Sequence, residues 1–528
     1  MSILSGFRDK SFLDKITILN DIATNRDAAE LEGLLELFNN PLGDTSVDYM
    51  VVTALNGVLS TDEKNVVDLL ESENTKLKTL CIRLSGEFGF KSAVPVLVRM
   101  AQGEKDSDLL FEEMTALSRI GDPEALSVFR ANLDNGEDLV RALCIEMVGE
   151  LGDTDSIPQL KKIIEINNED GNYEVCDLTT WKAVEALAFI KSDEALSFIV
   201  ENLHHRNPTV RRVVTDSLVD TGEDSLKFLK KVFSADANVD DMILSANVIG
   251  FIGEKSGLDI LMDALDKGFI KDPNVKYAVY EALGRIGTMK GVIRLMDGLE
   301  EDDELIMIAC VSGLDSLINP GVVKKLVELI GSGGSRAGKI IRAIVTAKAL
   351  NIFEQLYAEE KIGRFVMNAV VASKDSEIHS AFRGKLLEIG GDNSTKDIER
   401  LPEETQDVLR KALAADDSKS MLALYRSILT GVGFEPCVAE NGQVAYEFVE
   451  QGEEFDIIIT DMNMPVMDGM ELVSKLRNTP GFEDKPIIMV TTESESSQRD
   501  LAAKTGVTAF ITKPFTPEQL RAKIAELV

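Results

Sequence analysis

The sequence predicts a chain of two parts, an all-α solenoid of repeated helix pairs followed by an α/β domain with a five-stranded, doubly wound parallel sheet. Three observations lead to this prediction. The chain has 528 residues, which is too many for one hydrophobic core. A helical pattern that closes on glycine recurs through the first three quarters of the chain. Near residue 411 the hydrophobic period then changes from continuous helix to alternating strand and helix.

The amino-acid composition argues against several classes of function. The chain carries 90 Asp and Glu against 56 Lys and Arg, a formal net charge of −34, which would repel a phosphate backbone and argues against binding to nucleic acid. It has neither an apolar stretch of about 18 residues nor a signal-peptide pattern, so we expect a cytoplasmic protein without membrane insertion. Its five cysteines are scattered without a CxxC pair, which gives little support to disulfides or a zinc site.

The repeats predict the first part, which we place at residues 1–390. Segments such as "LVRALCIEMVGELGD" (139–153) and "VKYAVYEALGRIG" (275–287) are amphipathic helices that end at a glycine, and glycine suits the left-handed residue after a helix. Each unit is a pair of antiparallel helices over about 31 residues, and the pattern is clearest in 60–320. The closing glycines are Gly89, Gly121, Gly152, Gly222, Gly253 and Gly287.

This pattern resembles the HEAT family, and its short period is closest to the HEAT-like repeats of phycobilisome lyase proteins. The resemblance implies an extended surface that holds a partner, here an unknown protein. Residues before 60 and after 320 fit the register loosely, so we interpret them as degenerate or capping repeats.

Charged residues recur inside the repeats. A basic residue stands eleven positions before the closing glycine in four of them, and acidic residues follow the glycine in others. These charges could form a ligand-binding stripe, but stacked repeats place equivalent positions side by side, so a ladder of ion pairs between repeats is the favoured interpretation. The basic residues are Lys78, Arg141, Arg211 and Lys276, and the acidic ones are Asp122, Asp153, Glu223 and Glu254.

A polar segment, 391–410, is predicted to be a linker, and residues 411–528 are predicted to form the second domain. Five strands alternate with helices in this domain, and that order implies a parallel sheet with helices on both faces. The predicted strands are 412–415, 434–439, 456–460, 486–490 and 507–512, and the predicted helices are 418–430, 442–451, 469–478, 494–505 and 516–527.

The residues at the strand ends suggest chemistry, because ligands of such sheets bind beyond the carboxyl ends of the strands. The first strand ends on Asp416 and Asp417, the third on Asp461, the fourth on Thr491 and the fifth on Lys513. Three carboxylates at one edge repel each other, and Mg²⁺ relieves that repulsion with oxygen ligands. Together with a lysine and a hydroxyl, they form a phosphoryl-binding set in which Asp461 is the candidate nucleophile.

The blocks "ADDS", "ITDMNMPVMDG", "MVTTES" and "AFITKPF" resemble, in order and spacing, the signature of response-regulator receiver domains, which have a flavodoxin-like fold. The resemblance implies that Asp461 accepts a phosphoryl group from a histidine kinase. It further implies that Asp417, Asp461 and the backbone carbonyl of Asn463 ligate Mg²⁺, with Asp416 assisting through water.

The same resemblance assigns further roles. Thr491 would bond a phosphoryl oxygen, Lys513 would pair with it, and Phe510 would be an aromatic switch that turns inward when Thr491 moves. The bond between Lys513 and Pro514 is expected to be cis. Asn463 and Glu493 resemble the pair that tunes dephosphorylation in fast-cycling chemotaxis-type regulators.

We therefore expect a two-component phosphorelay protein, a phosphoacceptor rather than an enzyme with a separate substrate, in which Mg²⁺-dependent phosphorylation of Asp461 controls protein binding by the solenoid. One alternative is an adaptor or phosphate sink docked at a kinase or chemotaxis array. Another is a receiver-regulated module that resembles a bilin lyase.

Overall fold

The computed structural model describes residues 2–169, 178–205, 207–234, 237–268, 270–373, 375–401, 410–491, 505–513 and 515–528. The chain divides into two compact units. The first holds Met1–Ile164 and Leu178–Ile190, and the second holds Glu165–Asp177 and Lys191–Val528.

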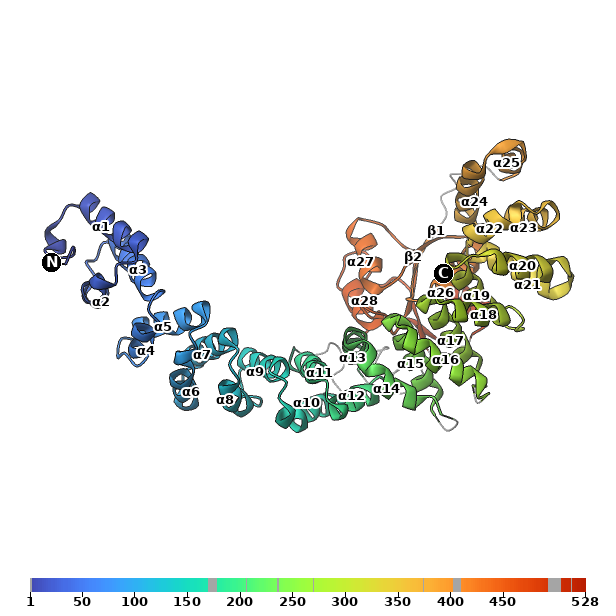
Figure 1. Ribbon diagram of the computed structural model, residues 1–528. Coiled ribbons are helices and arrows are strands. Elements are labelled where there is room, and N and C mark those ends of the chain that lie inside the picture. Colours follow the sequence, from blue (N-terminus) through green and yellow to red (C-terminus); the bar gives the residue numbers. More distant parts are fainter. Residues whose placement is uncertain are drawn as a thin grey trace. The chain divides into compact units, whose positions relative to one another are not determined.

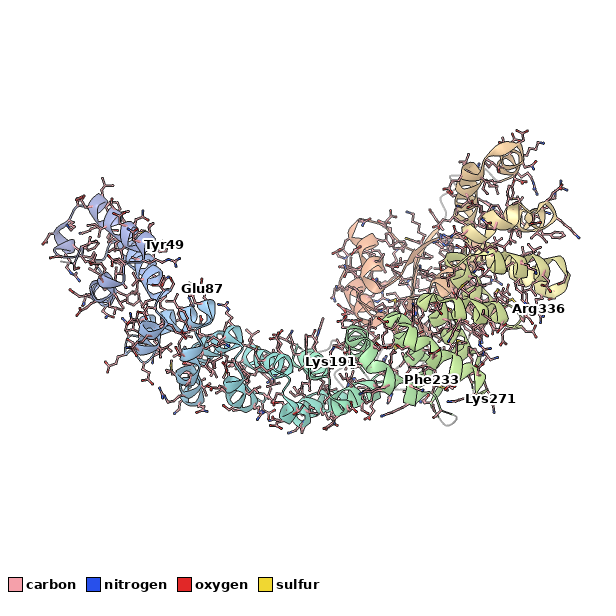
Figure 2. The ribbon with its side chains drawn as sticks, in the orientation of Figure 1. Tyr49, Glu87, Lys191, Phe233, Lys271 and Arg336 are labelled. Atoms are coloured by element: carbon pink, nitrogen blue, oxygen red, sulfur yellow. The ribbon has the colours of Figure 1, made fainter. Side chains whose placement is uncertain are left out.

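The first unit consists of paired helices in which each repeat packs on its neighbour, as α5 does on α7 and α9 on α11. Short 3-10 turns open several second helices: η2 (Ala28–Glu30), η3 (Lys91–Ala93), η4 (Pro123–Ala125) and η5 (Thr154–Ser156). A further 3-10 turn, η1 (Phe7–Asp9), precedes the first helix. The helices are α1 (Phe12–Asn25), α2 (Leu31–Asn39), α3 (Thr45–Leu59), α4 (Glu63–Leu69), α5 (Thr75–Phe88), α6 (Val94–Gly103), α7 (Ser107–Ile120), α8 (Leu126–Ala131), α9 (Asp138–Glu150), α10 (Ile157–Glu169) and α11 (Leu178–Ile190). Tyr49 of α3, labelled in Figure 2, is an exposed aromatic side chain of this unit, with 70% of its surface accessible.

The repeat motif contains two glycines that have different structural roles. The closing glycine has a positive φ, 66° at both Gly89 and Gly152, and so ends the helix in the left-handed conformation. The glycine three positions earlier brings two helices together, because a Cβ on Gly149 would lie 2.5 Å from the Cα of Ala186. Gly250 is equivalent, since its Cβ would lie 2.8 Å from the Cα of Ala282. The repeated G-x-x-G therefore encodes both a turn and a close helix contact.

The second unit continues the helix pairs and adds the C-terminal domain (Figure 1). Its helical part consists of α12 (Asp193–Glu201), α13 (Pro208–Thr221), α14 (Glu223–Val232), α15 (Val239–Ile252), α16 (Lys255–Asp266), α17 (Pro273–Ile286), α18 (Met289–Gly298), α19 (Glu304–Ser316), α20 (Pro320–Gly331), α21 (Gly334–Thr346), α22 (Leu350–Tyr357), α23 (Glu360–Ala372), α24 (Ser376–Ile389) and α25 (Gly391–Glu399).

Helix α25 lies inside the segment that was predicted to be a linker. Its polar sequence does not predict a packed helix, because the helix is held by contacts with the preceding helices. Ser394 is buried, and the Tyr357 hydroxyl donates to Asp397 Oδ2 at 2.8 Å. The helical array therefore extends to residue 399.

The C-terminal domain is a five-stranded parallel sheet in the order β2-β1-β3-β4-β5. One buried cluster joins the sheet to α27 and α28, which lie together on one side of it (Figure 1), and a second joins it to α26 and α30. The elements are β1 (Arg410–Ala415), α26 (Lys419–Gly431), β2 (Phe434–Ala439), α27 (Gly442–Glu450), β3 (Ile457–Asp461), α28 (Gly469–Arg477), β4 (Ile487–Thr491), β5 (Ala509–Thr512) and α30 (Pro517–Leu527).

The predicted fold class is confirmed, with strand ends within two residues of those expected. Most of the predicted helix 494–505 lies outside the described residues. Within the part of the chain that the structure describes, no helix is both long enough and apolar enough to cross a membrane.

Candidate functional site

Three strands deliver charged side chains to one edge of the sheet. Asp416 directly follows β1, Asp461 is the last residue of β3, and Lys513 directly follows β5. Lys513 Nζ lies 2.8 Å from Asp461 Oδ1 and 3.0 Å from Asp416 Oδ2. The structure thus brings together residues that stand 97 positions apart in the sequence.

Hydrogen bonds from the loops fix the two carboxylates. The backbone N–H of Asn463 donates to Asp461 Oδ2 at 3.0 Å, and the backbone N–H of Ser418 donates to Asp416 Oδ1 at 2.9 Å. The Tyr425 hydroxyl donates to Asp416 Oδ2 at 3.1 Å. Asp461 is 6% exposed, and Asp416 is fully buried. Both carboxylates are therefore held in one orientation.

Burial shapes the electrostatics of this acidic group. It raises the pKa of Asp461 to about 6, with Lys513 opposing the rise and Asp416 adding to it. It also raises the pKa of Asp417 to about 7, against the nearby Arg285 guanidinium. The pKa of Lys513 lies well above its ordinary value, because the two carboxylates outweigh the effect of burial. A further positive charge at this edge would favour the ionised carboxylates.

The donor set fits a hydrated Mg²⁺ rather than an all-protein cage. Among the described residues, no group of three or more His, Cys, Asp or Glu side chains is arranged to hold a metal ion. Mg²⁺ is usually bound through one or two carboxylates and keeps several waters. Asp417 and Asp461 could supply those carboxylates, since Asp416 already accepts bonds from Lys513, Tyr425 and Ser418.

The other predicted residues lie close to this edge or outside the described part. Thr491 ends β4 and is 1% exposed, and its hydroxyl lies 3.8 Å from Met462 Sδ. Phe510 of β5 is half-buried against the cluster that contains Met489. Glu493, expected to tune dephosphorylation, and the expected cis bond to Pro514 lie outside the described residues.

Sequence reasoning missed the contribution of the helical repeats. Helix α17 lies against the loop after β1, where the Tyr277 hydroxyl contacts Ser418 Oγ and Ser418 Oγ donates to Glu281 Oε1 at 2.7 Å. Arg285 Nη2 donates to the backbone carbonyl of Asp417 at 3.2 Å. A cavity of about 70 Å³ is lined from both sides, by Tyr277 and Glu281 and by the acidic group.

The predicted charge ladder is present in part, because Arg130 Nε of α8 donates to Asp153 Oδ2 of the next repeat at 2.6 Å. Three of the four recurring basic residues have other partners. Arg141 pairs with Asp138 of its own helix at 2.5 Å, and Lys276 pairs with Glu301 at 3.0 Å. Arg211 Nε donates to Asn463 Oδ1 at 3.0 Å, a contact with the C-terminal domain. The recurring basic position was the one signal in the sequence that pointed to Arg211.

Comparisons with known proteins agree with both parts of the fold. Residues 412–525 match the response regulator receiver domain, and 63–146, 132–218 and 226–315 match HEAT repeats. The chemotaxis protein CheY homolog of Campylobacter jejuni is 41% identical over 119 residues, which cover 22% of this chain and 92% of the relative. Chemotaxis protein CheY1 of Helicobacter pylori is 40% identical over 115 residues, covering 22% and 93%. The solved structure of Vibrio cholerae CheY4 is 35% identical, covers 23% of this chain and 100% of that chain, and has a TM-score of 0.22.

The sheet order, the acidic edge and these relatives define the C-terminal domain as a receiver domain of the CheY type. The chain belongs to the response-regulator family, with HEAT repeats preceding its receiver.

Proposed function

We propose that this protein is a cytoplasmic two-component response regulator in which a histidine kinase phosphorylates Asp461 in a Mg²⁺-dependent reaction. The observation that carries the proposal is the setting of the Asp461 carboxylate. It ends a buried strand, it lies 2.8 Å from Lys513 Nζ, and its second oxygen accepts from the Asn463 N–H. Such positioning and charge neutralisation are what phosphoryl transfer requires.

In the proposed reaction an Asp461 oxygen forms a bond to phosphorus while the bond from phosphorus to the donor histidine nitrogen breaks. Lys513 is placed to neutralise charge on the phosphoryl oxygens, and the Thr491 hydroxyl can donate to one of them. Asp417, Asp461 and the Asn463 carbonyl would hold Mg²⁺, with Asp416 assisting through water. The ion would supply charge neutralisation for the incoming phosphoryl group.

The proposed output is a change in protein binding by the HEAT repeats. Thr491 and Phe510 lie on neighbouring strands and would form the switch, because movement of one can be followed by repacking of the other. The contacts of Tyr277, Glu281 and Arg285 with the loop after β1 support a route from the site to the repeats.

Phosphorylation of the full chain tests the proposal directly. The protein is incubated with acetyl phosphate and Mg²⁺, or with a phosphorylated histidine kinase, and the intact mass is measured. We expect one phosphoryl group on the wild type and none on Asp461→Asn, with labelling lost when EDTA removes Mg²⁺. Asp456→Asn is the matched control, because Asp456 lies at the opposite end of the same strand, where it accepts from Lys411 N at 3.0 Å. Labelling of Asp461→Asn equal to that of the wild type would refute the assignment.

A role as an adaptor or phosphate sink shares this chemistry and differs in output. It predicts that phosphorylation leaves the repeats unchanged, which the exchange measurement described in the Discussion would show.

A further inference from the structure

The phosphorylation site of the receiver faces the repeats of its own chain. Tyr277 of α17 and Leu305 of α19 also pack against the receiver's buried cluster. Helix α26 lies on α19 and α21, and its Arg426 pairs with Glu377 of α24. The repeats therefore cover the edge that carries Asp461.

Arg211 is a repeat residue that contacts the loop after β3 directly. It lies on α13 and is 2% exposed. Its Nη1 donates to the His205 carbonyl at 2.6 Å, which anchors the guanidinium in the repeats. Its Nε donates to Asn463 Oδ1 at 3.0 Å, and Nη2 lies 3.4 Å from Met462 Sδ. One side chain thus ties a repeat to the two residues that follow Asp461.

The neighbouring arginine on α13 makes a different contact with the receiver. Arg212 Nη2 lies 3.5 Å from Glu471 Oε2, and its Nε lies 3.8 Å from Asp468 Oδ2. These carboxylates belong to the start of α28 and the residue before it. Arg212 therefore attaches the receiver to the repeats through the carboxylates at the start of α28, which makes it a natural comparison for Arg211.

The position of Asn463 gives its carboxamide a chemical role. Its backbone N–H is bonded to Asp461 Oδ2, and its side chain lines the cavity beside that carboxylate. When an aspartyl-phosphate is hydrolysed, a water oxygen bonds to phosphorus, the bond from Asp461 to phosphorus breaks, and a proton of the water leaves with the phosphate. The carboxamide oxygen can accept from that water and orient it. A guanidinium already bonded to this oxygen fixes its direction and weakens it as an acceptor.

We propose that the HEAT repeats form one side of the phosphorylation site and that Arg211 is a positioning residue, which restrains the Asn463 carboxamide and so prolongs the life of the phosphoryl group on Asp461. This inference rests on the proposed function, because it concerns the same phosphoryl group.

The test measures how fast the full chain loses its phosphoryl group. Wild type and variants are labelled with acetyl phosphate and Mg²⁺, the donor is removed by desalting, and the labelled fraction is followed by intact mass. We expect Arg211→Ala to shorten the half-life roughly tenfold, the scale of one charge-assisted hydrogen bond in the barrier. Arg211→Lys, which retains a donor and a charge, should fall between the two. Arg212→Ala should keep the wild-type half-life.

A double-mutant cycle separates positioning from a merely structural effect. If Arg211 acts through the carboxamide, Arg211→Ala changes nothing further in an Asn463→Ala background. Equal shortening by Arg211→Ala and Arg212→Ala, persisting without Asn463, would show that detachment of the receiver is responsible and would overturn the role of Arg211. An unchanged half-life in Arg211→Ala would also overturn it.

Two further results keep the test decisive. If Arg211→Ala does not fold, the same cycle is carried out with Arg211→Lys and wild type, each with and without Asn463→Ala. In that case a half-life of Arg211→Lys no shorter than that of wild type overturns the role. If the wild type takes up no label, the proposed function itself fails and the inference loses its basis. That outcome is distinct from a labelled protein whose half-life ignores Arg211.

Discussion

At the scale of single residues, Lys513 is the counter-charge of the buried acidic pair. Its Nζ bonds both Asp416 and Asp461, so its removal leaves two carboxylates in a poorly hydrated place. Breaking a buried ion pair from one side typically costs a few kcal/mol. We expect Lys513→Met to destabilise the receiver by about 3 kcal/mol, measured as faster hydrogen exchange in β1 and β3. The same substitution should cost less in an Asp461→Asn background, and an equal cost there would contradict the pairing.

Glu113 is a second residue whose burial has a measurable effect, here on how stability depends on pH. It is buried on α7, and among the residues that the structure describes neither of its carboxylate oxygens has a hydrogen-bond partner. Burial raises its pKa from 4.5 to about 7, Glu104 adds to the rise, and Lys78 opposes it. An acid with a raised pKa in the folded state contributes stability that is fully present below its unfolded pKa and is lost as the pH rises through about 7.

We therefore predict that the first unit loses up to about 3 kcal/mol of stability between pH 5 and pH 8. Urea unfolding followed by the fluorescence of Trp181 measures this, because Trp181 is the chain's single tryptophan and lies on α11 of that unit. Glu113→Gln should remove most of the pH dependence. Glu112→Gln is the control. A hydrogen bond from Arg83 lowers the pKa of the Glu112 carboxyl, so this neighbour of Glu113 stays ionised across the pH range measured. A pH profile of Glu113→Gln that matches wild type would contradict the assignment.

At the scale of helices and strands, the glycine that precedes the closing turn determines how closely two repeats approach. A Cβ on Gly250 would lie 2.8 Å from the Cα of Ala282, so α15 and α17 would have to separate. We expect Gly250→Ala to destabilise this contact by about 2 kcal/mol, seen as faster exchange in both helices. Gly384, inside α24, is the matched control, because nothing lies within 4 Å of its added Cβ. Gly384→Ala should stabilise α24 by about 0.5–1 kcal/mol.

The elements also show what local patterns can predict. Short apolar runs that alternate with amphipathic helical segments identified β1 to β5, because such runs and the glycine turns between them are encoded within a few residues. The acidic edge followed from the rule that parallel strands end together. Helix α25 was missed, since its stability depends on contacts such as Tyr357 with Asp397 rather than on its own polar sequence. The bond of Arg211 to Asn463 joins positions 252 apart, and a scattered helix charge looks the same whether or not it finds such a partner.

At the scale of the whole molecule, the contacts between receiver and repeats predict which helices change their hydrogen-exchange protection when the receiver is phosphorylated. Hydrogen exchange of the full chain is measured with Mg²⁺, with and without beryllofluoride as a phosphoryl mimic. We expect protection to change in α13, α15 and α17, whose residues contact or line the site, and to stay constant in α5 and α7. Asp461→Asn should show neither change. Changes confined to residues 410–528 would favour the adaptor or phosphate-sink role.

The separation of Arg211 from Asn463 also has a consequence for the order in which the protein is made. Repeats contact mainly their neighbours, so they can fold as they leave the ribosome. The surface of α13, α15 and α17 is then made before the receiver that covers it, because the receiver follows the last helix of the array. At about 5–20 residues per second, the 252 positions between the two side chains correspond to roughly 10–50 s of synthesis. In the later part of that interval, once residue 305 has been made, the nascent chain presents Tyr277 and Leu305 uncovered. Ribosome-bound chains stalled before residue 410 are therefore the form in which chaperones would meet this surface.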